Sequence, residues 1–178
     1  MSRKCLFHLL SFVALLISAV AQDAVRMPTI EGESFAGQRV ILPDAAAGNV
    51  AVLVLGFTKA SKSPTTAWAD KLLADFGTRQ EFVLYQLPVL EDVPRFVRGM
   101  VISGIKKGVP EDKRDHFIPI LQKEAELKKL VHYTEADDAY VVVLGRSGET
   151  LALSHGNAPS DANYAQVRNT IESALKQK

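Results

Sequence analysis

The apolar residues of this chain fall into short continuous runs and stripes of helical spacing. The run from Val50 to Phe57 is apolar at nearly every position, which is typical of a strand covered on both faces. Beyond a polar turn, Trp68, Leu72 and Phe76 recur at every fourth residue and predict a helix with one apolar face, ended by Gly77. A buried strand followed by an amphipathic helix is a typical unit of an α/β protein.

The same patterns predict the remaining elements. Strands are expected at 38–43, 81–90, 116–121, 139–144 and 150–155, and helices at 94–108, 123–131 and from Ser160 or Asp161 onward. Pro119 places the strand at 116–121 at a sheet edge, because proline cannot donate to a ladder of hydrogen bonds. The helix after Pro94 carries an apolar face made of Phe96, Val97, Met100, Val101 and Ile105.

The last two strands are joined by the short turn GRSGE, which indicates a β-hairpin. Strands that alternate with helices and end in a hairpin predict an α/β protein. The expected architecture is a three-layer α/β/α sandwich around a central mixed sheet.

The first 21 residues have the pattern of a signal peptide. Arg3 and Lys4 precede an apolar segment at 9–20, and the small residues of Ala19-Val20-Ala21 form a cleavage site before Gln22. The alternative is an uncleaved anchor, although the segment is short for a membrane span. We therefore expect a signal peptide at 1–21, an extended segment at 22–37 and one domain at 38–178, with an exported protein in the periplasm or outside the cell and no membrane span after cleavage.

Cleavage would leave a nearly neutral chain without cysteine. Two of the 21 basic residues would be removed while all 20 acidic residues stay, which gives a net charge of −1. That balance argues against nucleic acid and anionic membrane surfaces as main partners. The single cysteine, Cys5, precedes the apolar segment, so the exported chain would have no disulfide, thiolate nucleophile or thiolate metal ligand.

The order of elements, with the strings VAVLVLGF, HFIPIL and AYVVVLGRSGETLALSHG, resembles the thioredoxin-like redoxin fold over residues 35–176. It is similar to the secreted peroxiredoxin-like and thiol-oxidoreductase branches. In that family the turn after the first core strand holds the reactive cysteine. The resemblance places Ser63 at the cysteine position, Thr66 where a CxxC pair would have its second cysteine, and Ala139 at the usual cis-proline. An ordinary trans peptide is expected before Ala139.

The chain also resembles the mitochondrial ATP synthase assembly factor family, which has a redoxin-like domain and a serine followed by a tryptophan after the first core strand. The matching residues here are Ser63 and Trp68. This resemblance implies an assembly or chaperone-like role without redox turnover, and the predicted signal peptide fits an exported relative.

The candidate chemical groups have simpler structural interpretations. Ser63 as a nucleophile would need an adjacent base, and no histidine or GxSxG elbow lies near it, so it is expected to cap the helix that starts at Pro64. Trp68 could line a groove, but its spacing favours the core. His116, His132 and His155 form no metal-ligand pair, and Glu91-Asp92 and Asp137-Asp138 are typical turn residues.

No glycine-rich phosphate cradle follows the strand at 50–57, so no nucleotide and no other cofactor is expected. We expect a non-catalytic module that binds a protein or peptide of the cell envelope through the vacant redox site. The binding residues are predicted to be Ser61, Ser63, Thr66, Trp68 and Ala139. The alternatives are a redoxin-related oxidoreductase or peroxidase-like enzyme, and a hydrolase that uses Ser63.

Overall fold

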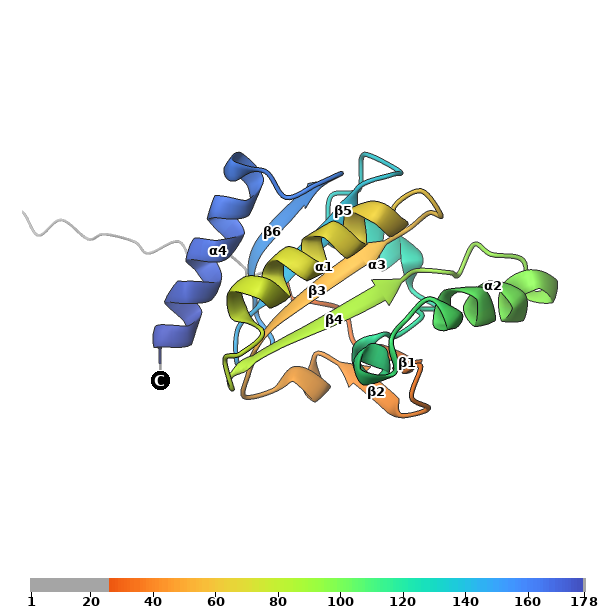
Figure 1. Cartoon of the computed structure of the whole chain (residues 1–178), viewed down its shortest axis with the longest axis horizontal. Coiled ribbons are helices and arrows are strands. Elements are labelled where there is room, and N and C mark those ends of the chain that lie inside the picture. The colour runs from red at the N-terminus through yellow and green to blue at the C-terminus, as the bar shows by residue number, and fades with distance from the viewer. Residues whose placement is uncertain (1–25, 178) are drawn as a thin grey trace, which may run out of the picture.

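The computed structural model describes residues 26–177, so the predicted signal peptide lies outside the described residues. A four-stranded sheet in the order β4-β3-β5-β6 forms the centre (Figure 1). Its strands are β3 (Val50–Gly56), β4 (Phe82–Pro88), β5 (Ala139–Leu144) and β6 (Thr150–Gly156). Strand β3 runs parallel to β4 and antiparallel to β5, and β5 and β6 form the predicted hairpin. The expected mixed sheet is confirmed.

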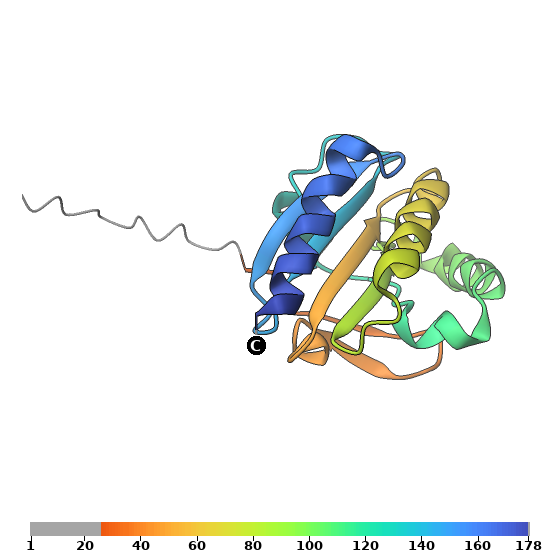
Figure 2. The same cartoon turned by 60° about the vertical axis from the view of Figure 1, so that its left-hand side comes forward.

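Both faces of this sheet are covered, which is why β3 and β5 are apolar at almost every position. Every residue of these two strands is buried. Helices α1 (Lys62–Phe76) and α4 (Asp161–Lys176) lie on one face, as Figures 1 and 2 both show. The short helix α3 (Glu124–Leu130) packs into the core on the other face. The α/β sandwich expected from the alternating pattern is therefore present.

A second, two-stranded sheet closes the core beside α3. Strand β1 (Ile30–Glu33) pairs antiparallel with β2 (Arg39–Leu42), after which a 3₁₀ turn, η1 (Asp44–Ala46), leads into β3. The sequence predicted β2 but treated the segment before it only as an extended lead-in. Ile30 of β1 is buried against the same core as Leu42, so the described part of that lead-in belongs to the domain core.

The continuous strand predicted at 116–121 is wrong. The 3₁₀ turn η2 (Glu111–His116) takes its first residue, and the residues that follow make only isolated parallel bridges to the edge strand β4. The amides of Ile118 and Ile120 donate to the carbonyl oxygens of Gln86 and Pro88, at 3.0 and 2.9 Å. Pro119 lies between them, where a strand residue would direct its N–H away from β4, so the missing donor falls on the free edge. The edge position that proline predicted is confirmed.

Helix α2 (Arg95–Lys107) follows β4 beyond this edge and projects from the body (Figure 1). The helix itself was predicted, but none of its residues is buried. Of its predicted apolar face, Phe96 is 90% and Met100 77% exposed. Among residues 26–177, no helix is long and apolar enough to cross a membrane.

Candidate binding site at the end of the sheet

Two loops and the end of one strand meet where β3 leads into α1. They are residues 57–66, which form the loop after β3 and the start of α1, the loop at 134–138 before β5, and the last two residues of β6; we call this region the loop end. The Thr58 hydroxyl lies 3.0 Å from the carbonyl oxygen of Ala136 and 3.4 Å from a carboxylate oxygen of Asp137. Segments far apart in the sequence are thus held together at the place where the resemblance puts the redox site.

Ser61 is buried and has its hydrogen bonds satisfied within its own turn. Its hydroxyl donates to the carbonyl oxygen of Thr58 at 2.7 Å and accepts from the Thr58 amide at 3.3 Å. Gly56 makes room for it, because a Cβ at that position would lie 2.6 Å from the Ser61 oxygen. The hydroxyl of Ser61 therefore fixes the turn and is not presented to a ligand.

Ser63 does not cap helix α1, so that prediction is wrong. The helix begins at Lys62, with Ser61 as the residue before it and no side-chain cap. Pro64 is accordingly its third residue, a position a proline tolerates because the first turn of a helix has no partners for its N–H groups. The side chain of Ser63 is exposed, and no hydrogen bond of its hydroxyl is found within residues 26–177.

Thr66 is exposed one turn further along α1. Its hydroxyl donates to the carbonyl oxygen of Lys62 at 2.9 Å, and that of Thr65 makes the same contact. Ser63 and Thr66 are thus the members of the predicted site whose side chains reach the surface.

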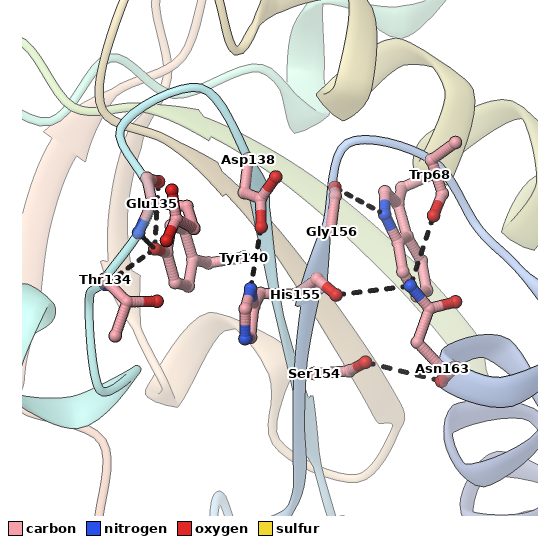
Figure 3. Close-up of polar contacts among 10 residues, drawn as sticks. Trp68, Thr134, Glu135, Asp138, Tyr140, Ser154, His155, Gly156 and Asn163 are labelled. Carbon is pink, nitrogen blue, oxygen red and sulfur yellow. Dashed lines mark hydrogen bonds and ion pairs between the residues drawn. The ribbon is translucent and has the colours of Figure 1, made fainter.

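Trp68 lies in the core, as its helical spacing favours. The side chain is fully buried, its ring packs beside Tyr164, and its indole Nε1 donates to the carbonyl oxygen of Gly156 at 3.1 Å (Figure 3). Ala139 is also fully buried and pairs with Gly156 across the hairpin. Within residues 26–177 the only cis peptide bond is Leu42-Pro43, so the bond before Ala139 is trans, as expected. Trp68 and Ala139 are therefore buried beneath the loop end and support it without reaching its surface.

Sequence reasoning missed a histidine and carboxylate pair at the loop end. His155 Nδ1 lies 2.7 Å from a carboxylate oxygen of Asp138, and the imidazole stacks on Tyr140 at a ring distance of 5.4 Å (Figure 3). The hairpin register contained the signal, because His155 is the partner of Tyr140, two residues after Asp138. The imidazole remains partly exposed, with 46% of the His155 side chain accessible.

Tyr140 fixes the loop that precedes it. Its hydroxyl accepts hydrogen bonds from the amides of Thr134 and Glu135, at 2.9 and 2.8 Å, and donates to the Glu135 carbonyl oxygen at 3.0 Å (Figure 3). One buried side chain thus holds three backbone groups of the loop. Asp138, at the end of that loop, is set in place to meet His155.

Aromatic side chains and one lysine form the neighbouring surface. Phe57 and Tyr133 contact each other and Tyr140, with ring distances between 5.1 and 5.6 Å. The Lys128 ammonium lies 4.9 Å from the centre of the Tyr133 ring and 2.6 Å from a carboxylate oxygen of the buried Glu124. This contact, chiefly its hydrogen bond, raises the pKa of Lys128, so the cation is held at this position.

A hydrolase would need a nucleophile hydrogen-bonded to the imidazole of His155. In the described part of the chain, no hydrogen bond joins His155 to a serine or threonine hydroxyl. No group of three or more histidine, cysteine, aspartate or glutamate side chains there could hold a metal ion. The arrangement offers hydrogen-bonding groups on a fixed frame.

No protein-family model and no curated protein sequence matches this chain. Solved structures do. BsSco, a member of the Sco family of cytochrome c oxidase assembly proteins, has a TM-score of 0.59 at 14% identity, over 88% of this chain and 98% of its own. A thiol-disulfide oxidoreductase from Bacteroides fragilis has a TM-score of 0.54 at 12% identity, over 81% of this chain and 98% of its own. The exposed lipoprotein thioredoxin Etrx1 of Streptococcus pneumoniae has a TM-score of 0.55 at 10% identity, over 82% of this chain and 99% of its own.

This chain has a thioredoxin-like fold. The sequence-based fold prediction is confirmed, and at these identities the likeness concerns the fold alone. The sequence has one cysteine, Cys5, and it lies outside the described residues. Residues 57–66, which lead from β3 into α1, therefore contain no thiol.

Proposed function

We propose that this protein is an exported, thioredoxin-fold binding module that assists the assembly or handling of another protein without redox turnover. The binding surface is the exposed part of the loop end, made of Ser63, Thr66, Asp137 and His155, and the mostly buried Asp138 orients His155. Trp68 and Ala139 are buried beneath this surface and support it by fixing the positions of α1 and the start of β5.

One observation carries this proposal: the loop end is held by hydrogen bonds on both sides, and residues 57–66, where the redox cysteine of the fold would lie, contain no thiol. The hydroxyls of Thr58 and Ser61 are held in contacts with the backbone of the two loops. Tyr140 fixes the facing loop by three hydrogen bonds. A surface that is preorganised in this way binds at low cost in conformational entropy.

The exposed groups suit an extended peptide. Ser63 and Thr66 offer hydroxyls from α1, and His155, oriented by Asp138, offers an imidazole from the hairpin. A strand-like segment that crosses the loop end would meet both sets, and its backbone amides and carbonyls would find donors and acceptors there. BsSco, which has a similar fold, belongs to a family of cytochrome c oxidase assembly proteins, so an assembly role is compatible with this fold.

Co-purification with matched surface variants tests the proposal. Ser63→Arg places a long cation at the loop end, and Thr78→Arg makes a comparable change at an exposed position beyond the other end of α1. We expect a partner from the cell-envelope fraction to be retained by the wild type and Thr78→Arg and lost with Ser63→Arg. Equal recovery with both variants would place the contact elsewhere.

The enzyme alternatives are tested on the purified protein with Cys5→Ser, which has no thiol. We expect no catalysed reduction of insulin disulfides, no peroxide consumption and no labelling of Ser63 by serine-directed reagents. Turnover that Ser63→Ala abolishes would favour a hydrolase or another enzyme and would overturn the binding proposal.

A further inference from the structure

The outward side of helix α2 carries two large apolar side chains in open solvent. Phe96 and Met100 lie one turn apart on the same side, with exposed fractions of 90% and 77%. Gly99 and Gly104 flank them, and a Cβ built on either glycine would meet no atom within 4 Å. No part of residues 26–177 therefore covers this side of the helix.

The charges of α2 all have one sign. The helix contains Arg95, Arg98, Lys106 and Lys107 and no acidic residue. Arg98 is held by the body, because its guanidinium donates to the carbonyl oxygens of Glu91 and Val93. Within residues 26–177 no carboxylate lies within ion-pair distance of the other three cations.

The geometry of the helix places these cations beside the apolar pair. At 100° per residue, Lys107 falls between Phe96 and Met100 in projection, two to three turns further along, and Arg95 borders the same side. Lys106 instead lines a hollow beside β1, together with Ile102, Glu31 and Glu33. Val97, Val101 and Ile105 are half-buried, so they lie on the less exposed side of the helix. The exposed side thus combines protruding apolar groups with cations at both ends, which is the pattern of a helix that lies in a membrane interface.

We propose that α2 docks the protein onto an anionic membrane surface. The Phe96 and Met100 side chains enter the boundary between headgroups and acyl chains, and Arg95 and Lys107 lie among the anionic headgroups. The near-neutral charge of the whole chain argued against such a surface as the main partner, but attraction to lipid depends on the charge near the bilayer, and here it is concentrated on one helix.

A second copy of the chain fits this surface less well, because two all-cationic helices would face each other. A protein groove would need to supply both acidic groups and deep apolar pockets, whereas a fluid interface accommodates protruding side chains without a matching shape. The contact is independent of the loop end and of the function proposed for it.

Tryptophan fluorescence in the full chain tests the proposal. Phe96→Trp places a reporter on α2, and Leu151→Trp places the control at an exposed apolar position on β6. The native Trp68 is buried and contributes the same background to both. The two variants also share the N-terminal segment, so any tethering by that segment affects them equally.

With vesicles of brominated phosphatidylglycerol, we expect the Phe96→Trp emission to shift to the blue and to be quenched, with little change for Leu151→Trp. Adding Arg95→Glu and Lys107→Glu should weaken this α2 signal by roughly thirtyfold in lipid concentration. Equal quenching of both reporters, quenching that survives charge reversal, or a blue shift that depends on protein concentration without vesicles would overturn the proposal. The last result would indicate a second copy on α2.

Discussion

The indole of Trp68 donates a hydrogen bond to the carbonyl oxygen of Gly156, 3.1 Å away, and so joins helix α1 to the end of strand β6. The two residues lie 88 positions apart in the sequence. Their contact sets the distance between the helix that carries Ser63 and Thr66 and the strand that carries His155. Through it, a core side chain determines the shape of the proposed binding surface.

Trp68→Ala is expected to lower the free energy of unfolding by about 3–5 kcal/mol, because it leaves a cavity in a fully buried site. Trp68→Phe should cost less, since the ring volume is largely kept and the hydrogen bond and part of the packing are lost. Urea denaturation measures both values. A cost for Trp68→Ala below that of Trp68→Phe would contradict the packing described here.

Gly56→Ala tests the close approach of the Ser61 hydroxyl. The added methyl group would lie 2.6 Å from the Ser61 oxygen and 3.0 Å from Cγ2 of Thr65, so we expect destabilisation of about 1–3 kcal/mol. Ser61→Ala alone removes the bond to Thr58, at about 0.5–1.5 kcal/mol. The double variant should cost less than the sum of the two single variants, because the oxygen that the new methyl group would meet is gone. Strict additivity in urea denaturation would argue against the contact.

Asp75 gives the stability a pH dependence of known sign. The hydrogen bond from Lys71, followed by that from Tyr164, lowers the pKa of Asp75 below its ordinary value. A lowered pKa in the folded state adds stability that is complete above the pKa of the unfolded chain and is lost as the pH falls through the folded value. The wild type should therefore exceed Asp75→Asn in stability at neutral pH, and the difference should shrink below about pH 4.

Tyr164→Phe removes one of the two hydrogen bonds to Asp75. The Tyr164 hydroxyl donates to an Asp75 carboxylate oxygen at 2.6 Å, and we expect the variant to lose about 0.5–1.5 kcal/mol at neutral pH. Urea unfolding at pH 7 and pH 3 checks the sign of both effects. A wild-type advantage that grows on acidification would be incompatible with the contacts of Asp75.

The pair of His155 and Asp138 predicts a specific tautomer. The carboxylate of Asp138 lies 2.7 Å from Nδ1, so neutral His155 should carry its proton on Nδ1 and have an unprotonated Nε2. Nitrogen-15 NMR of the imidazole distinguishes the two tautomers. Asp138→Asn should reduce the Nδ1 form, and a wild-type imidazole protonated mainly on Nε2 would be inconsistent with this contact.

The sequence predicted the central sheet well because burial on both faces leaves an unbroken apolar run, as in Val50–Gly56. Local sequence patterns failed to predict the contacts of side chains whose hydrogen-bond partners lie in other parts of the chain. Ser63 matched a capping pattern, yet the helix begins at Lys62, two residues before the predicted Pro64, because Ser61 is held in the turn by Thr58. His155 looked isolated until the hairpin register placed it near Asp138. Periodicity predicted one apolar face for α2, but only Val97, Val101 and Ile105 of that face are half-buried, whereas Phe96 and Met100 are exposed.

Photo-cross-linking at the loop end tests the central claim most directly. A photoreactive amino acid in place of Ser63 would report contacts at the proposed surface, and the same group in place of Thr78 would report contacts beyond the other end of α1. On irradiation of intact cells, we predict a discrete protein adduct from position 63 and none of that mass from position 78. No adduct at position 63, or the same adduct from both positions, would contradict a binding role for the loop end.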